Sequence, residues 1–211
     1  MSAVTPPTST TRSARATRRQ ENLAKLLVAL EELLAAGETF ADISVERLAN
    51  RAGVSRSTFY VHFTDKGQVL EEISADLVEQ LLEAGRGWWG RAAPADRATL
   101  RERARVIVAT YRPRAELMRA VTDTSAHDPA VREVFRALTD RYVDELTEHI
   151  VTGQRDGTVR GDVPARATAA MLTWMAERAL DRMLRGADDA AADAVVEAFT
   201  AIVWNTLYDH P

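Results

Sequence analysis

The chain has 211 residues, of which 46% are hydrophobic and 27% charged, as in a soluble globular protein of one or two domains. It has no cysteine, which excludes disulfides and thiolate metal sites, and no signal-peptide core or apolar run of membrane-spanning length is evident, so we expect a cytoplasmic protein with no membrane association. The net charge of −4 is uneven, because residues 1–66 carry nine Lys and Arg against seven Asp and Glu, which predicts a weakly basic N-terminal part and an acidic remainder.

The N-terminal segment is rich in Ser, Thr and Pro and has no apolar period, so we predict a disordered arm over residues 1–17. The four arginines between Arg12 and Arg19 fit either an arm that follows DNA phosphates or a solvated tail. A first helix is predicted over about Arg18–Ala36, with Thr17 and Gln20 as a capping box. Its apolar stripe consists of Leu23, Leu27, Leu30 and Leu34.

Two short helices joined by a tight turn are predicted next. Ser44 can cap the first helix, and Gly53 suits the left-handed conformation that often follows a helix end. Ser55 can cap the second helix almost immediately. Two helices that meet across so short a turn have the geometry of a helix-turn-helix.

The second helix of this pair, about Arg56–Phe63, can bury Phe59 and Phe63 together. The side chains left outside are short or planar hydrogen-bonding groups without acids: Arg56, Ser57, Thr58, Tyr60 and His62. Such a face suits the base edges and phosphates of a DNA major groove, although a buried helical hairpin with a polar outer face is the plainer alternative. Asp65 is expected to cap the next helix, and Lys66 in its first turn calls for an anionic partner, for which a phosphate is a reasonable candidate.

This part of the chain resembles the DNA-binding domain of TetR/AcrR-type bacterial transcriptional regulators. The resemblance rests on the stretches Ile43–Val45, Ala52–Ser55 and Thr58–Phe63, followed by Lys66. This resemblance implies an all-α fold with a three-helix head over residues 18–66 that contains the helix-turn-helix. It also implies a homodimer that binds double-stranded DNA at a palindromic operator. The residues expected to contact DNA are Ser44, Arg56, Ser57, Thr58, Tyr60, His62 and Lys66, with Arg56 and Thr58 on base edges.

The remaining residues, 67–211, are expected to form a helical ligand-binding and dimerisation domain, which gives about nine helices in all; glycines at 85, 87 and 90 interrupt the pattern, and beyond Pro94 every segment reads as helix. The expected segments are 66–85, 95–112, 113–124, 129–156, 164–185 and 188–208, each bounded by Pro, Gly or a cluster of capping residues. The last two are dense in alanine, which permits close helix approach, so we expect them to form a four-helix dimer interface rather than an intrachain core.

Aromatic side chains recur in or beside these helices and fit either an ordinary core or an apolar small-molecule pocket. The segments Met175–Arg178 and Val203–Tyr208 resemble the C-terminal helices of the EthR-like subgroup, the mycobacterial repressors of ethionamide activation. That resemblance implies a pocket for a small hydrophobic ligand, although Thr173 and Ala176 stand where the subgroup has polar amides. The expected ligand-binding residues are Trp88, Trp89, Tyr111, Phe135, Tyr142, Thr173, Trp174 and Trp204.

The sequence gives little support for catalysis, because it contains no paired metal-binding histidines, phosphate-binding loop or nucleophile elbow. Asp123, His127 and Asp128 cluster, but helix capping explains them more simply than a metal site. We therefore expect no enzyme activity, cofactor or metal. The predicted function is that of a repressor released from DNA by a small hydrophobic ligand; the alternative is a ligand-independent DNA-binding protein that acts structurally or through a protein partner.

Overall fold

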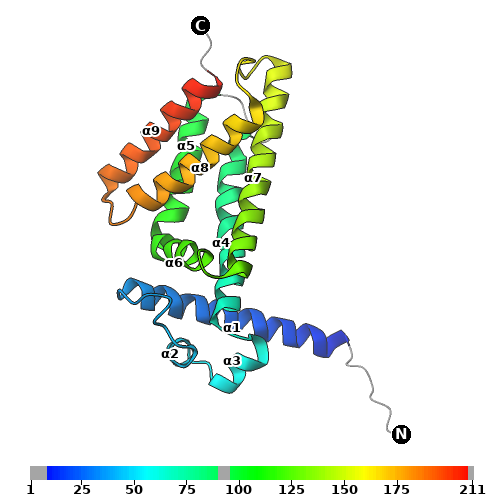
Figure 1. The fold of residues 1–211 in the computed structure, drawn as a ribbon, viewed down its shortest axis with the longest axis vertical. Helices are drawn as coiled ribbons and strands as arrows, with labels where there is room; N and C mark the ends of the chain where they lie inside the picture. The colour runs from blue at the N-terminus through cyan, green and yellow to red at the C-terminus, as the bar shows by residue number, and fades with distance from the viewer. Residues whose placement is uncertain (1–8, 90–95, 209–211) are drawn as a thin grey trace. The chain divides into compact units, whose positions relative to one another are not determined.

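The computed structural model describes the backbone of residues 9–89 and 96–208 and the side chains of residues 15–86 and 96–208. Within these residues all regular secondary structure is helical, which confirms the all-α prediction (Figure 1). The chain divides into two compact units, Met1–Ile73 and Ser74–Pro211. The boundary lies inside helix α4 (Lys66–Trp89), a short way beyond the division at residue 66 expected from the sequence.

The first unit contains α1 (Ser9–Ala35), α2 (Val45–Arg51), α3 (Arg56–His62) and the first turns of α4. The predicted caps form: the side-chain oxygens of Ser44 and Ser55 accept backbone N–H groups of Arg47 and Thr58. Gly53, between the two helices, adopts a φ of +65°, a conformation that a side chain would strain. The helix-turn-helix is therefore built by the local signals that predicted it.

The start of α1 differs from the prediction. The helix begins at Ser9 instead of near Arg18, so residues 9–17 are helical and Thr17 is not at a capping position. Helix propagation adds one hydrogen bond for each residue that is ordered, and residues such as Arg15 and Ala16 favour it, so a helix nucleated by the buried stripe can extend backwards. Residues 9–17 of the predicted arm are therefore helical, and residues 1–8 lie outside the described residues.

The core of the first unit forms beneath α3. Phe59 and Phe63 are almost fully buried, as predicted, and their ring centroids lie 5.5 Å apart. Leu27 is only half-buried, and Leu26 and Leu33 take its place in the α1 stripe. The largest fully buried side chains of this unit are Leu26, Leu30, Ile43, Leu48, Phe59, Phe63 and Leu70.

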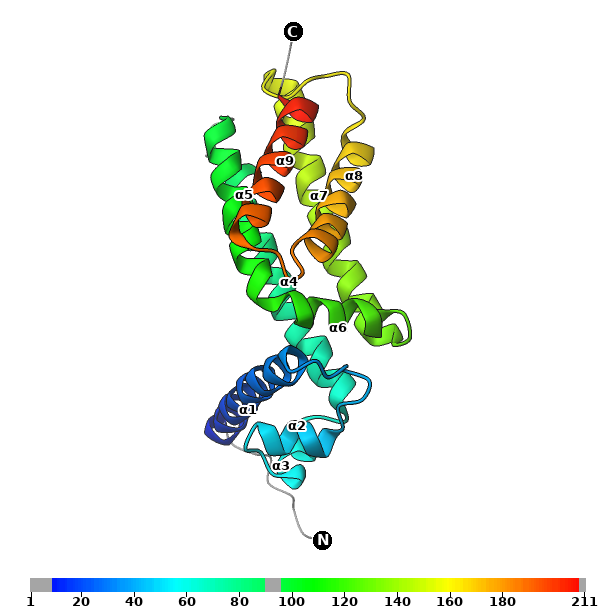
Figure 2. The same cartoon turned by 90° about the vertical axis from the view of Figure 1, so that its left-hand side faces the viewer.

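The second unit contains the rest of α4 and the helices that follow it. These are α5 (Arg97–Tyr111), a 3-10 turn (Arg112–Arg114), α6 (Ala115–Ser125), α7 (Pro129–Asp156), α8 (Ala165–Met183) and α9 (Asp189–Leu207). Their bounds confirm the predicted segments to within a few residues. Figures 1 and 2 show α7 beside α8 and α5 beside α9. Asp96, Asp128 and Asp188 cap α5, α7 and α9.

Helix α9 is long and apolar enough to cross a membrane by length and composition alone, and no other helix among the described residues is. The expectation that no uninterrupted apolar run approaches that length still holds, because Asp193 and Glu197 interrupt α9. The evidence for a membrane span is weak, because core helices pass the same criterion, and alanines account for much of the apolar character of α9.

Replacement of Phe59 by Ala should lower the free energy of unfolding by about 3–5 kcal/mol, because it opens a cavity where the ring is fully buried. The matched control is Val61→Ala on the same helix, where a 57% exposed side chain should change stability by no more than about 0.5 kcal/mol. Urea denaturation followed by circular dichroism measures both. Equal effects of the two variants would contradict the inward packing of Phe59.

Candidate functional site

The outer face of α3 is polar and free of acids. Arg56, Ser57 and Tyr60 are exposed, and Thr58 and His62 are half-buried at the edge of that face. The Arg56 guanidinium lies 5.8 Å from the centroid of the Tyr60 ring, so the two side chains support each other above the surface. The structure thus brings the five predicted α3 residues onto one accessible region.

The start of α3 is stiffened by its hydroxyl groups. Ser55 Oγ lies 2.9 Å from Ser57 Oγ and 2.8 Å from Thr58 Oγ1, and it accepts the Thr58 backbone N–H at 3.0 Å. A rotatable hydroxyl can still accept from or donate to a further partner. The network fixes the direction of the Thr58 side chain. The Thr58 hydroxyl keeps part of its hydrogen-bonding capacity for a further partner.

Val61 belongs to the same exposed region, and the sequence reasoning missed it. Its side chain is 57% exposed near the C-terminal end of α3, whereas Phe59 of the same helix is fully buried. The signal that could have revealed it is the spacing of four residues from Ser57, which places both on one helix face. An exposed methyl-bearing side chain there suits contact with a thymine methyl group.

The neighbouring helix α2 presents Ser44 at its exposed N-terminus, where its Oγ accepts the Arg47 N–H at 3.1 Å. Arg47 pairs with Glu38, and the hydrogen bond from Arg47 lowers the pKa of that carboxyl. Arg51 pairs with Glu32 at 2.5 Å. These two arginines are held by carboxylates, whereas Ser44 remains accessible beside them.

Lys66 is a correction to the predicted phosphate contact. Its ammonium donates to the backbone carbonyls of Phe40, Ala41 and Ile43 at 2.6, 2.8 and 2.7 Å, which uses all three N–H protons. Desolvation by burial lowers the pKa of Lys66, and the nearby Asp42 opposes that effect. A cation at a helix start does need a partner, but here the partner is the α1–α2 loop of its own unit.

The second unit contains an apolar cavity of about 300 Å³, within the range of small-molecule sites. It is lined by α4, α5, α6, α7, α8 and α9. The aromatic side chains in its wall are Tyr111, Phe135, Tyr142 and Phe199. Burial raises the pKa of both tyrosines, so their hydroxyls stay protonated and can donate hydrogen bonds.

Of the predicted ligand-binding residues, the cavity wall includes Tyr111, Phe135, Tyr142 and Thr173. Trp174 does not belong to it: the side chain is 59% exposed on the opposite side of α8. Trp204 is also outside the wall and packs on Tyr208, with ring centroids 5.0 Å apart. The side chains of Trp88 and Trp89 lie outside the described residues.

Several wall residues lie on the two helices that the sequence analysis assigns to the dimer interface. Met175 and Ala179 on α8 and Phe199 on α9 line the cavity. Glu177, a carboxylate in this apolar wall, had no assigned role. Helical spacing showed that these residues share faces of α8 and α9, but it does not say whether a face meets a cavity, the core or another subunit.

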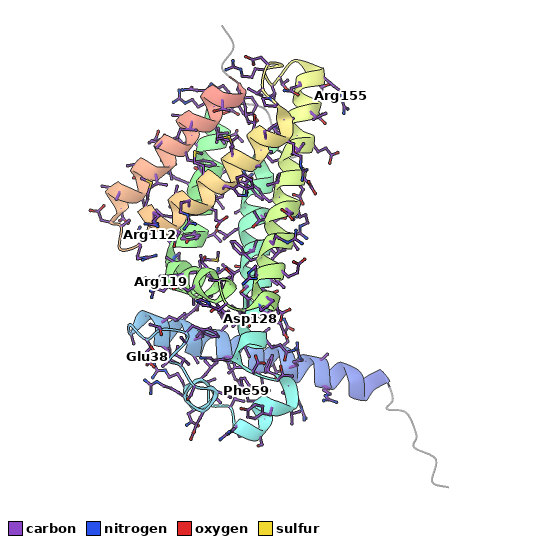
Figure 3. The ribbon with its side chains drawn as sticks, viewed as in Figure 1. Glu38, Phe59, Arg112, Arg119, Asp128 and Arg155 are labelled. Carbon is purple, nitrogen blue, oxygen red and sulfur yellow. The ribbon has the colours of Figure 1, made fainter. Side chains whose placement is uncertain are left out.

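The acidic cluster before α7 is a cap, as expected. Asp128 Oδ1 accepts the backbone N–H groups of Ala130 and Val131 at 2.9 and 3.3 Å, and Figure 3 shows Asp128 at the start of α7. Within the described part of the chain, no group of three or more His, Cys, Asp or Glu side chains could hold a metal ion.

Comparison with known proteins places this geometry in a family. Residues 26–73 match the family of bacterial regulatory proteins called tetR, and residues 100–209, half of the chain, match the C-terminal domain of the transcriptional regulator EthR. The chain belongs to the TetR family. Its C-terminal domain is of the EthR type, and these families are transcriptional regulators, not enzymes.

Relatives matched over most of their length agree with this TetR-family membership. The HTH-type transcriptional regulator EthR of Mycolicibacterium smegmatis is 28% identical over 86% of this chain and 84% of its own length. The EthR of Mycobacterium tuberculosis is 29% identical over 92% of this chain and 90% of its own.

Solved structures share the fold. A transcriptional regulator from Saccharomonospora viridis, crystallised with choline, superimposes with a TM-score of 0.71 at 19% identity, over 92% of this chain and all of its own. The TetR-family regulator PfmR of Thermus thermophilus superimposes with a TM-score of 0.62 at 24% identity, over 92% of this chain and 97% of the PfmR chain.

Lys66→Met should lower the free energy of unfolding by about 2 kcal/mol, because three backbone carbonyls, two of them part-buried, lose a charged donor. Lys25→Met is the matched control, since Lys25 is an exposed lysine of α1 and should tolerate the change. Thermal unfolding gives both values. A fully stable Lys66→Met protein whose DNA affinity had lost part of its salt dependence would restore the phosphate contact.

Proposed function

We propose that this TetR-family regulator is a homodimeric repressor that binds a palindromic operator through α3 of each protomer and leaves it when a small apolar ligand fills the cavity of the second unit. The observation that carries this proposal is the division of α3 into two faces. Phe59 is buried, while Arg56, Ser57 and Tyr60 form an acid-free surface that fits a major groove. DNA binding is consistent with a cytoplasmic location.

The proposed division of DNA contacts follows from side-chain chemistry. Arg56 has the planar donor fork that reads guanine, and Thr58 and Val61 suit hydroxyl and methyl contacts with base edges. Ser57 lies beside them on the same face. Tyr60, His62 and Ser44 are assigned to phosphates, because each offers a single hydrogen bond at the border of the exposed region.

The proposed dimer forms through α8 and α9. Met171 and Trp174 are 68% and 59% exposed on α8, on the side away from the cavity, whereas Ile202 of α9, 45% exposed, lines the cavity. Two large apolar side chains exposed together on one helix mark an association surface more often than a solvated one. A second copy of the chain is the expected occupant, because a palindromic operator requires two heads about one helical turn apart.

The proposed coupling between ligand and DNA uses α4, which is one continuous helix. Its first turn is held in the first unit by the Lys66 contacts, and its later residues Val78, Leu81 and Leu82 line the cavity. A ligand that binds more tightly to one conformation of this helix shifts the population towards it. The ligand-independent alternative would fit a collapsed second unit better than one with an apolar cavity.

The function is tested by gel shifts on the DNA upstream of the protein's own gene, repeated with a library of hydrophobic compounds. Formation of a specific protein–DNA complex that some of the compounds dissociate supports the proposal. A specific complex that no compound affects, while none binds the protein in calorimetry, would favour the ligand-independent alternative.

Replacement of Arg56 by Ala should weaken operator binding by about 1–3 kcal/mol and relax the preference at one base position. Tyr60→Phe, which removes only a hydroxyl, should weaken binding to all sequences about equally. Titrations on an operator and its single-base variants measure both. Uniform losses for both variants would refute the division into base and phosphate contacts.

Trp174→Asp should convert the dimer into a monomer and abolish tight operator binding, because a charge replaces a large apolar side chain at the proposed interface. His127→Asp, an exposed change on the α6–α7 turn, is the control and should remain dimeric. Analytical ultracentrifugation and gel shifts provide the readouts. A dimer that survives the change at Trp174 would exclude this face of α8.

A further inference from the structure

One charged side chain stands among the described residues that line the cavity. Glu177, on α8, is half-buried in a wall that is otherwise apolar or hydroxyl-bearing. No described side chain or backbone group donates a hydrogen bond to its carboxylate or forms an ion pair with it. A half-buried carboxylate that has no donor from the protein keeps its hydrogen-bonding capacity for water or for a ligand.

The nearby arginines do not supply that donor. Arg178 and Arg185 both pair with Asp181, at 3.7 and 3.2 Å, and Arg182 lies 4.0 Å from the same carboxylate. Desolvation by burial raises the pKa of Glu177, Arg178 opposes this from a distance, and Asp181 adds to it. The nearby arginines therefore form their ion pairs with Asp181, and none of them forms one with Glu177.

The same wall contains aromatic faces. Tyr111, Phe135, Tyr142 and Phe199 line the cavity that contains Glu177. The negative faces of aromatic rings attract organic cations, and the attraction grows when both partners are removed from water. A single carboxylate beside several rings in an apolar cavity is the combination that holds an alkylated amine or a quaternary ammonium group.

We propose that the cavity selects an amphipathic organic cation, an apolar molecule with one amine or quaternary ammonium group that lies against Glu177. This inference rests on the proposed function of the cavity as the ligand site and adds the charge of the ligand. Because the Glu177 carboxylate forms no ion pair with the described residues, it also repels the carboxylate of a ligand. Binding of fatty acids and other apolar anions is therefore disfavoured. The cavity volume of about 300 Å³ limits the ligand to a compact molecule.

Three probes that carry different polar groups on the same phenylbutyl chain test the proposal: 4-phenylbutyltrimethylammonium, 4-phenylbutanol and 5-phenylpentanoate. Isothermal titration calorimetry on the full chain should show the cation binding at least about tenfold more tightly than the alcohol. The carboxylate should show no measurable binding. Glu177→Gln should lower the affinity for the cation about tenfold or more and leave that for the alcohol unchanged.

The control variant is Glu148→Gln, which removes an exposed carboxylate of α7 in the same unit and should leave all three affinities unchanged. Circular dichroism checks that both variants fold. A second variant, Phe199→Leu, keeps an apolar wall but removes an aromatic ring. It should lower the affinity for the cation more than the affinity for the alcohol.

Each other outcome overturns a defined part of the proposal. Equal affinities for cation and alcohol, unaffected by Glu177→Gln, would retain the ligand site and reject its preference for cations. Tighter binding of the carboxylate would reject that preference as well. Failure of all three probes to bind, in a protein that still binds operator DNA, would remove both the cation preference and the support for a ligand-controlled repressor.

Discussion

The burial of Phe59 and Phe63 beneath α3 is the constraint on which the DNA-facing surface depends. A helix of seven residues is not stable alone, because nucleation costs more than so few hydrogen bonds return. Phe59 is fully buried and the Ser55 cap fixes the first turn. The phenylalanines point inward, whereas Arg56 and Tyr60, which are also four residues apart, remain exposed. The packing of the head and the surface proposed to read DNA are therefore one arrangement.

Helix α4 connects that arrangement with the rest of the chain. Its beginning is held to the first unit by Lys66 and by the bidentate contact of Arg19 with Glu72, and the Arg19 guanidinium also lies 5.0 Å from the centroid of the Phe63 ring. Further along, Arg86 pairs with Glu145 of α7 at 2.9 Å, so α4 is fixed within the second unit too. A helix anchored in each unit is a suitable element for the proposed coupling, because a ligand need only favour one of its positions.

Helix α8 has two different faces. One face contributes Thr173, Met175, Ala176 and Glu177 to the cavity, and the other exposes Met171 and Trp174. If the exposed face meets a second copy, the ligand and the partner subunit contact the same helix from opposite sides. In the proposed mechanism this arrangement is a direct physical route from cavity occupancy to dimer geometry, and the proposed role of Glu177 would make that route depend on ligand charge.

The amino-acid sequence by itself determined the helices and their local ends. The caps at Ser44, Ser55 and Asp128 and the left-handed turn at Gly53 depend on residues a few positions apart, so they could be predicted without a fold. The helical start of α1, the partners of Lys66 and the surroundings of Trp174, Trp204 and Glu177 emerged only in the tertiary structure. Periodicity identifies which side chains share a helix face, but whether that face meets a carbonyl, a cavity or solvent is decided by segments distant in the sequence.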